Sequence, residues 1–218
     1  SLPLIRRALD LTPMLSAIYV GFADGGLFYI RRLDFAAARR AERAPAGTAY
    51  MVQISTPGDS GSSVRFYDEA MILLSSRATP RHSPYDLPWF DAALERSGLI
   101  RTQAFTLSSR EIGFAIAQAT PDRKAVIGAD LALKDLSASL SRQRASPSAQ
   151  LALTDRSGKV LAASHGAWAM ADGKPLELPT LTTMEMPVLA KAFSGANSGS
   201  GAQTLSSEGR DWETLTVT

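Results

Sequence analysis

The sequence predicts an α+β fold in which antiparallel sheets are flanked by helices. Most apolar runs are short and are separated by turn residues, which is typical of strands. A few stretches with helical spacing interrupt these runs, and this alternation fits an antiparallel sheet better than a parallel doubly wound one. With 218 residues, of which 45% are hydrophobic, the chain can form one large or two small packed domains.

The first third of the chain predicts one helix end followed by strands. Leu2, Ile5 and Leu9 have helical spacing, and the following Thr-Pro pair ends the pattern, so residues 1–12 are interpreted as the end of an N-terminal helix. Two strands are predicted on either side of the turn at Gly25. The strands predicted in this part cover residues 17–22, 27–33, 48–54, 64–67 and 71–74, with a short helix over 35–43.

The middle of the chain predicts a helix, a hairpin and a further strand. Pro88 fits the first turn of a helix, because its missing N–H costs nothing there. Residues 99–107 and 112–119 are predicted to form a hairpin that turns at two serines, and residues 124–131 form the next strand. A leucine stripe from Leu133 to Leu140 then predicts a helix.

The last third predicts a smaller αβ unit. It contains a hairpin that turns at Ser157-Gly158, a short helix near 187–193 and a hairpin rich in Gly and Ser. The predicted organisation is therefore the end of a helix over 1–12, a first module over 13–144 and a second module over 145–218. Because the chain stops in a strand-like run, the second module is expected to be incomplete.

Composition excludes several classes of function. The chain has no cysteine, which rules out disulfides, thiolate metal sites and a cysteine nucleophile. Its only histidines, His82 and His165, are far apart in sequence, and no metal or cofactor is predicted. The net charge is +2, and the basic residues are scattered rather than gathered into a stripe, so nucleic acid is not an expected partner.

The chain is expected to be a soluble fragment of a longer protein. No run approaches the ~18–20 apolar residues that span a bilayer, and no signal peptide is visible. The sequence starts with Ser1 in the middle of a pattern, which indicates that segments lie outside it.

A Gly-Asp-Ser-Gly string around Ser60 raises the alternative of a serine hydrolase. A nucleophilic serine needs a general base that a carboxylate orients. In trypsin-like enzymes, which share this string, the histidine precedes the serine, but no histidine precedes Ser60 here. A polar loop explains the residues fully. A hydrolase that combines Ser60 with His82 or His165 is kept as a hypothesis.

The most informative stretch is residues 82–94, in which two prolines bracket an aromatic pair before an apolar run. By itself it is explained by a helix start that buries two aromatic rings in a core. Yet it also resembles the start of a pocket helix in double Cache sensor domains, whose usual form is Tyr-Asp-Pro-Arg-x-Arg-Pro-Trp-Tyr-x-x-Ala. The residues that carry the resemblance are Pro84, Pro88, Trp89, Phe90 (for the second Tyr) and Ala93.

Three further segments are similar to this family in the same order, so that the resemblance covers nearly the whole chain. They are residues 17–25, 126–131 and 151–162. The resemblance implies two PAS-like (Cache) modules, each with a central antiparallel sheet. It also implies the extracytoplasmic, periplasmic part of a homodimeric inner-membrane receptor that binds a small molecule. The membrane would be reached through segments outside this chain.

The resemblance is strongest to sensor regions ahead of class III adenylate/guanylate cyclases. The segments that carry it are residues 9–13, 18–21 and 47–50. It implies that this fragment is not an enzyme, and that the full-length protein has a cyclase as its output domain. A ligand-free dimerisation module is a further alternative.

The resemblance also implies a ligand-binding site, with departures from the family. The family's two arginines fall on Tyr85 and Leu87, its leading tyrosine on His82, and a later Tyr and Asp on Phe105 and Leu107. Asp130 corresponds to an aspartate that contacts the ligand's amino group, although it could equally cap the next helix. The predicted pocket is lined by Tyr85, Leu87, Trp89, Phe90, Phe105 and Leu107, with Asp130 below.

The composition of this predicted pocket bears on its ligand. Leu87 cannot hold a carboxylate, so ordinary α-amino acids are not the expected ligand, and a small neutral or weakly cationic molecule fits better. A pocket filled by its own side chains is an alternative. If His82, or an arginine from elsewhere such as Arg110, held an acidic ligand, this inference would be overturned.

Overall fold

The computed structural model describes residues 2–33, 36–58, 61–107, 111–165, 177–195 and 200–217. The chain divides into two compact units, Ser1–Asp135 and Leu136–Thr218. This division falls inside helix α4 (Leu133–Arg142), whereas the sequence places the boundary after that helix, between residues 144 and 145. No helix in the described ranges is long and apolar enough to cross a lipid bilayer.

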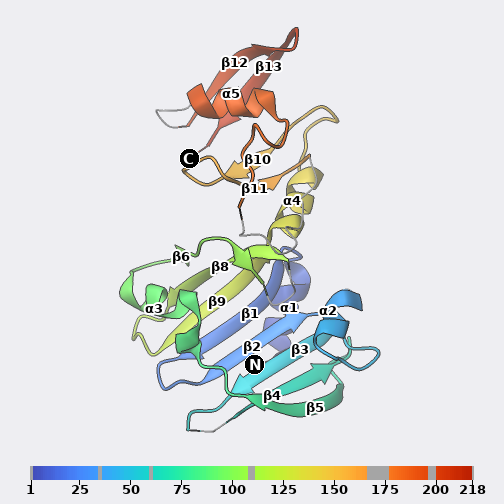
Figure 1. Ribbon diagram of the computed structural model, residues 1–218, viewed down its shortest axis with the longest axis vertical. Coiled ribbons are helices and arrows are strands. Elements are labelled where there is room, and N and C mark those ends of the chain that lie inside the picture. Colours follow the sequence, from blue (N-terminus) through green and yellow to red (C-terminus); the bar gives the residue numbers. More distant parts are fainter. Residues whose placement is uncertain are drawn as a thin grey trace. The chain divides into compact units, whose positions relative to one another are not determined.

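The first unit is built on a nine-stranded antiparallel sheet (Figure 1). The α+β fold with an antiparallel sheet, as predicted from the sequence, is confirmed. The strand order is β5-β4-β3-β2-β1-β9-β8-β6, and β7 also pairs with β8. The strands are β1 (Leu15–Phe22), β2 (Leu27–Arg32), β3 (Tyr50–Ser55), β4 (Gly61–Tyr67), β5 (Leu73–Pro80), β6 (Ile100–Arg101), β7 (Phe105–Thr106), β8 (Ile112–Ala119) and β9 (Ala125–Ala132).

Two strand predictions were wrong in their extent. The strand expected at 71–74 is β5, which continues to Pro80 as a largely exposed edge strand. Its polar stretch lacks the apolar alternation that marks a half-buried strand. The first arm of the expected hairpin, 99–107, contains only two short strands. Between them, the Thr102 hydroxyl accepts the hydrogen bond of the Ala115 N–H, so that a side chain replaces part of the backbone ladder.

The two faces of this sheet are covered by different helices. Helix α1 (Leu2–Leu11) packs on one face, where Leu9 contacts Ile30 of β2. The opposite face carries α2 (Ala36–Ala41) above β3 and β4, and the 3-10 turn η1 (Pro84–Asp86) with α3 (Pro88–Glu95) near β1, β8 and β9. Since neighbouring residues of a strand point to opposite faces, Tyr29 lies on the α2 and α3 side.

Arg32 holds the C-terminal end of α1 against the sheet. Its guanidinium donates hydrogen bonds to the carbonyl oxygens of Leu9, Pro13 and Leu15 at 2.8–3.0 Å. The Leu9 carbonyl lies in the last turn of α1, where carbonyl oxygens have no N–H partner four residues further along the helix. A cation is also favourable at a helix C-terminus.

The second unit has smaller sheets. Strands β10 (Ala152–Thr154) and β11 (Val160–Ala163) form one hairpin, and β12 (Gly201–Ser207) and β13 (Arg210–Thr216) form another. Helix α5 (Pro187–Gly195) precedes the second hairpin. The core beside β11 consists of Val160, Ala163, Leu181 and Met186. The incomplete second module stays a prediction.

Candidate functional site

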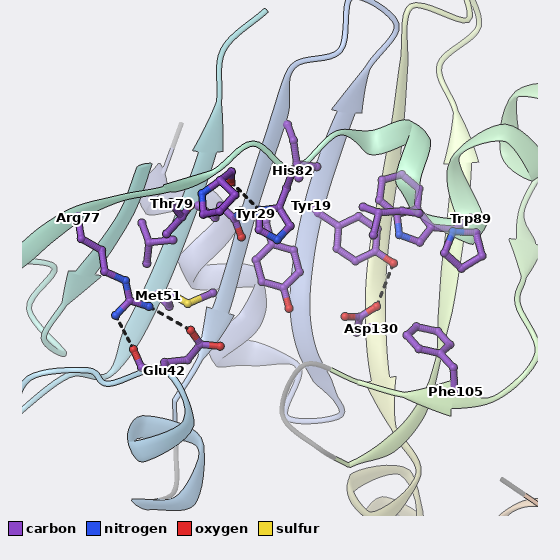
Figure 2. A pocket seen from close by; sticks show the side chains of 16 residues that line it. Tyr19, Tyr29, Glu42, Met51, Arg77, Thr79, His82, Trp89, Phe105 and Asp130 are labelled. Carbon is purple, nitrogen blue, oxygen red and sulfur yellow. Dashed lines mark hydrogen bonds and ion pairs between the residues drawn. The ribbon is translucent and has the colours of Figure 1, made fainter. Parts of the chain in front are cut away.

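A cavity of about 440 Å³ lies on the sheet face that carries α2 and α3 (Figure 2). Strands β1, β2, β3, β4, β5, β7 and β9 contribute to its floor and wall, and the segment from Pro80 to Trp89 crosses above it. The lining residues are Tyr19, Leu27, Tyr29, Glu42, Met51, Gln53, Val64, Arg77, Thr79, Pro80, His82, Leu87, Pro88, Trp89, Phe105 and Asp130.

Strand register explains why these residues meet. Tyr19 of β1 lies opposite Tyr29 of β2, and Tyr29 lies opposite Gln53 of β3. Side chains in such a cross-strand row point to the same face of the sheet. One residue further along, the same strands turn their side chains toward α1, so the register alone selects the residues that reach the cavity.

Stacked aromatic rings form one end of the cavity. The Tyr19 and Trp89 rings are stacked with centroids 4.4 Å apart, and Tyr19 and Tyr29 are 5.9 Å apart. Tyr19 lies across Gly128 of β9, where a Cβ atom would be 2.1 Å from the ring. Any larger side chain at position 128 would therefore displace the Tyr19 ring.

Asp130 lies at the same end of the cavity and is only 6% exposed. The Tyr19 hydroxyl donates a hydrogen bond of 3.0 Å to its Oδ1 atom. Burial raises the pKa of Asp130 to about 6, against the opposing effects of the Tyr19 hydrogen bond and the charge of Arg31. Burial and the neighbouring carboxylate likewise raise the pKa of Tyr19. Asp130 lies inside β9, three residues before the start of α4, and lines the cavity. Its role in ligand binding stays a prediction.

Two buried serines attach the segment from Pro80 to Trp89, called the covering segment below, to the sheet. Ser55 of β3 and Ser62 of β4 are cross-strand partners. The Ser55 hydroxyl donates to the backbone carbonyl of His82 at 2.7 Å, and the His82 N–H donates to the Ser62 hydroxyl at 3.1 Å. The serine pair therefore bonds both main-chain groups of the residue that lies above the cavity.

The structure brings four of the seven predicted site residues together and places three elsewhere. Leu87, Trp89, Phe105 and Asp130 line the cavity. Tyr85, Phe90 and Leu107 do not.

Each of these three side chains has another environment. Tyr85 is 50% exposed, and its hydroxyl donates to the Ala23 carbonyl oxygen at 2.8 Å. Phe90 is fully buried beside Gly21, where a Cβ atom would come within 2.9 Å of its ring. Leu107 is buried next to Gly113, with a corresponding distance of 2.5 Å to its Cδ1 atom. Their roles in ligand binding stay predictions.

Sequence reasoning missed the charged groups at the other end of the cavity. Glu42, which follows α2, and Arg77 of β5 both line it. Arg31 of β2 is 2% exposed, and its Nη2 atom lies 2.5 Å from Oε1 of Glu42. The alternation of Leu27, Tyr29 and Arg31 along a predicted strand is the signal that could have placed Arg31 on the pocket face.

The groups needed for a serine hydrolase are not brought together in the described part of the chain. Ser60 and Arg110 lie outside the described residues. His82 lines the cavity with its Nδ1 atom 3.1 Å from the Pro80 carbonyl oxygen, so this nitrogen carries the proton. His165 lies in the other unit, where Arg144 donates to its Nε2 atom and its Nδ1 atom donates to Ser164. That arrangement is the reverse of a base that activates a serine.

Comparisons with known proteins give one curated relative and several solved structures. No family model matches the chain. Adenylate cyclase 1 of Rhizobium meliloti (strain 1021) is 29% identical over 147 residues, which are 64% of this chain and 22% of that protein. The chain thus spans about a fifth of the length of this relative.

The solved structures are similar over almost the whole chain. Methyl-accepting chemotaxis protein X matches with a TM-score of 0.46 and 15% identity, over 99% of this chain and 72% of that chain. The extracellular domain of the histidine kinase mmHK1S-Z2 matches with a TM-score of 0.45 and 13% identity, over 98% and 73%. Part of the chain is thus similar to part of an adenylate cyclase, in agreement with the motif resemblance.

Proposed function

We propose that this chain is the extracytoplasmic, ligand-sensing region of a bacterial transmembrane receptor, and that the cavity of the first unit binds the ligand. The output domain is a class III nucleotide cyclase, supported by the motif resemblance and by the partial match to an adenylate cyclase. The receptor acts as a homodimer in the inner membrane, as the resemblance implies. A ligand in the cavity shifts the population between two arrangements of the receptor.

The observation that carries this proposal is a buried carboxylate facing a cavity. Asp130 is nearly inaccessible, yet in the described part of the chain its hydrogen-bond partner is the neutral hydroxyl of Tyr19, and no basic side chain forms an ion pair with it. The hydrogen bond of Tyr19 and the charge of Arg31 compensate this buried carboxylate only in part, because burial still raises its pKa to about 6. A structural core would gain from an apolar residue here, so the acid is better explained by a ligand that compensates it.

The surroundings of Asp130 define the group that it binds. A carboxylate has about four acceptor positions, and Tyr19 uses one of them. An amine or hydroxyl can donate to the remaining positions in a charge-assisted hydrogen bond. The faces of Tyr19 and Trp89 lie beside the acid and also attract a cation. We therefore expect an amine at this end, and not an α-carboxylate, because Leu87 is the residue that lines the corresponding wall.

Thermal unfolding of the 218-residue chain with simple amines tests the proposal. We expect hexylamine to raise the melting temperature in a saturable way, because a compound that binds only the native state stabilises it. Asp130→Asn removes the charge with little change in shape and should abolish the rise, whereas Asp91→Asn on the exposed side of α3 should leave it unchanged.

A second variant tests the location of binding. Leu87→Trp fills part of the cavity from the half-buried covering segment and should weaken binding at least tenfold. Equal stabilisation of the wild-type chain and both cavity variants would contradict the proposed site. No stabilisation by any amine, alcohol or carboxylate would favour the ligand-free dimerisation module.

A further inference from the structure

We infer that the opposite end of the same cavity is a second polar subsite that binds a carboxylate, so that the ligand carries an amine and a carboxylate separated by an apolar spacer. This inference rests on the proposed function and names the ligand class. The subsite consists of the lining residue Gln53 of β3 with the charged cluster of Arg31, Glu42 and Arg77. Figure 2 shows Glu42 and Arg77 of this cluster.

Gln53 supplies an uncompensated hydrogen-bonding group. It lines the cavity from the centre of the sheet, opposite Tyr29 and Val64. Its Nε2 atom is buried and has no hydrogen-bond partner among the described residues. A buried amide nitrogen that donates no hydrogen bond loses the free energy that its hydrogen bonds to water would give. A ligand oxygen placed in the cavity would restore that bond.

The charged cluster beside Gln53 has one more positive than negative group. Glu42 Oε1 accepts from Arg31 Nη2 at 2.5 Å, and Glu42 Oε2 lies 3.6 Å from Arg77 Nη2. Arg77 Nη1 also donates to the Glu42 carbonyl oxygen at 2.7 Å. One carboxylate is thus shared by two guanidinium groups, so an anion at this end of the cavity is favoured electrostatically.

Arg31 has hydrogen-bonding capacity beyond its ion pair. Its Nε and Nη1 atoms are buried and have no partner in the described parts of the chain. Arg31 lies on the same face of β2 as Tyr29, and its cross-strand neighbour Met51 lines the cavity. Arg31 therefore places a positive charge beside the lining residue Met51, and this charge also acts on Asp130.

The strand order sets the distance between the two polar ends. Asp130 is on β9 and Gln53 is on β3, with β1 and β2 between them. Gln53 lies in the cross-strand row of Gly128, two residues along β9 from Asp130. Three strand spacings with this offset amount to about 16 Å between the Cα atoms. Hydrogen bonds of about 2.9 Å at each end leave roughly 10 Å for the ligand. An α-amino acid, whose two charged groups lie on adjacent carbons, is too short to reach both ends, whereas 6-aminohexanoate has a suitable length.

The lining between the two ends is apolar and aromatic. Tyr19 and Tyr29 lie in the row that connects the two strands, and Met51 lies beside Gln53 on β3. These side chains favour a methylene spacer over a polar one. A short peptide such as triglycine has the same terminal groups with a polar spacer. A comparison of triglycine with 6-aminohexanoate therefore distinguishes a peptide ligand from an amino acid with a methylene spacer.

The test compares compounds that differ in one end only. We expect 6-aminohexanoate to bind about tenfold more tightly than hexylamine in thermal unfolding titrations, because it adds a charge-assisted hydrogen bond. Triglycine should bind more weakly than 6-aminohexanoate, and glycine should not bind. Tighter binding of triglycine would assign the site to peptides and overturn the apolar spacer.

Variants separate this inference from the proposed function. Gln53→Leu should lower the affinity for 6-aminohexanoate to that for hexylamine and leave hexylamine unaffected. Gln118→Leu, at an exposed glutamine of β8, is the matched control and should change neither affinity. Equal affinities of both compounds in wild type, with no effect of Gln53→Leu, would overturn the second subsite while the amine site stands. Failure of both compounds to bind would overturn the proposed amine site.

Discussion

Gly128 of β9 and Tyr19 of β1 are cross-strand partners, and the aromatic ring lies directly over the glycine Cα. This position lets the Tyr19 hydroxyl reach Asp130 and the Tyr19 ring stack on Trp89. One missing side chain therefore determines the geometry of the acidic end of the cavity.

Gly128→Ala should destabilise the protein by about 1–3 kcal/mol, because the added methyl group would force the Tyr19 ring out of its position. Urea unfolding measures the change. Gly201→Ala is the matched control, since Gly201 is also in a strand but a Cβ atom there would meet nothing within 4 Å. Equal stability of both variants would contradict the close contact.

Tyr19→Phe should raise the pKa of Asp130 above about 6, because the hydrogen bond from Tyr19 favours the ionised carboxylate. An NMR titration of the Asp130 carboxyl carbon measures this shift. Tyr85→Phe removes a hydroxyl that bonds to the Ala23 carbonyl oxygen outside the cavity, and should leave the Asp130 titration unchanged. A lower pKa of Asp130 in Tyr19→Phe would be inconsistent with the described bond.

Stability should fall with pH in a window that Asp130 defines. Its pKa is about 6 in the folded chain and about 3.9 in an unfolded chain, so the folded state holds the proton more tightly. The resulting stabilisation is fully present below pH ~4 and is lost as the pH rises through 6, by about 3 kcal/mol in total. Comparison of wild type with Asp130→Asn by urea unfolding from pH 4 to pH 7 should show this change, and parallel curves would refute it.

Amine binding should have the opposite pH dependence. A cationic ligand needs an ionised Asp130, so the affinity for hexylamine should fall roughly tenfold for each pH unit below 6. Titration calorimetry at pH 5, 6 and 7 measures this. A constant affinity over this range would show that the amine does not contact Asp130.

Ser62→Ala should loosen the covering segment without unfolding the sheet. The substitution removes the acceptor of the His82 N–H and the hydroxyl that bonds Ser55. We expect faster hydrogen exchange at the His82 amide, equivalent to about 1–2 kcal/mol of lost protection. Ser63→Ala on the opposite face of β4 is the control and should leave this amide protected.

The sequence predicted those residues of the site that stand in local motifs, and missed those that only the strand pairing brings together. Trp89 and Asp130 stand in local motifs, so both could be assigned to the cavity before the structure was known. Phe90 is the neighbour of Trp89 in the same motif, but adjacent residues of a helix point in different directions, and only Trp89 reaches the cavity.

The charged end could not be predicted in the same way. Arg31, Glu42 and Arg77 belong to no motif and come from three separate parts of the chain, namely β2, the segment after α2, and β5. Their proximity depends on the pairing of β2, β3, β4 and β5, which the polar sequence of β5 did not reveal. Tyr19 was missed for a related reason, since its contact with Asp130 joins residues that are 111 positions apart.

The attachment of the covering segment has a consequence for engineering this domain. Ser55 and Ser62 bond the peptide groups of His82 and make no use of its imidazole, which lines the cavity. Residue 82 can therefore be randomised to alter which compounds the cavity recognises. The two hydrogen bonds from the serines to the main chain of residue 82, which hold the covering segment on the sheet, are retained. A biosensor library built on position 82, with both serines unchanged, would explore new selectivities at little cost in folding.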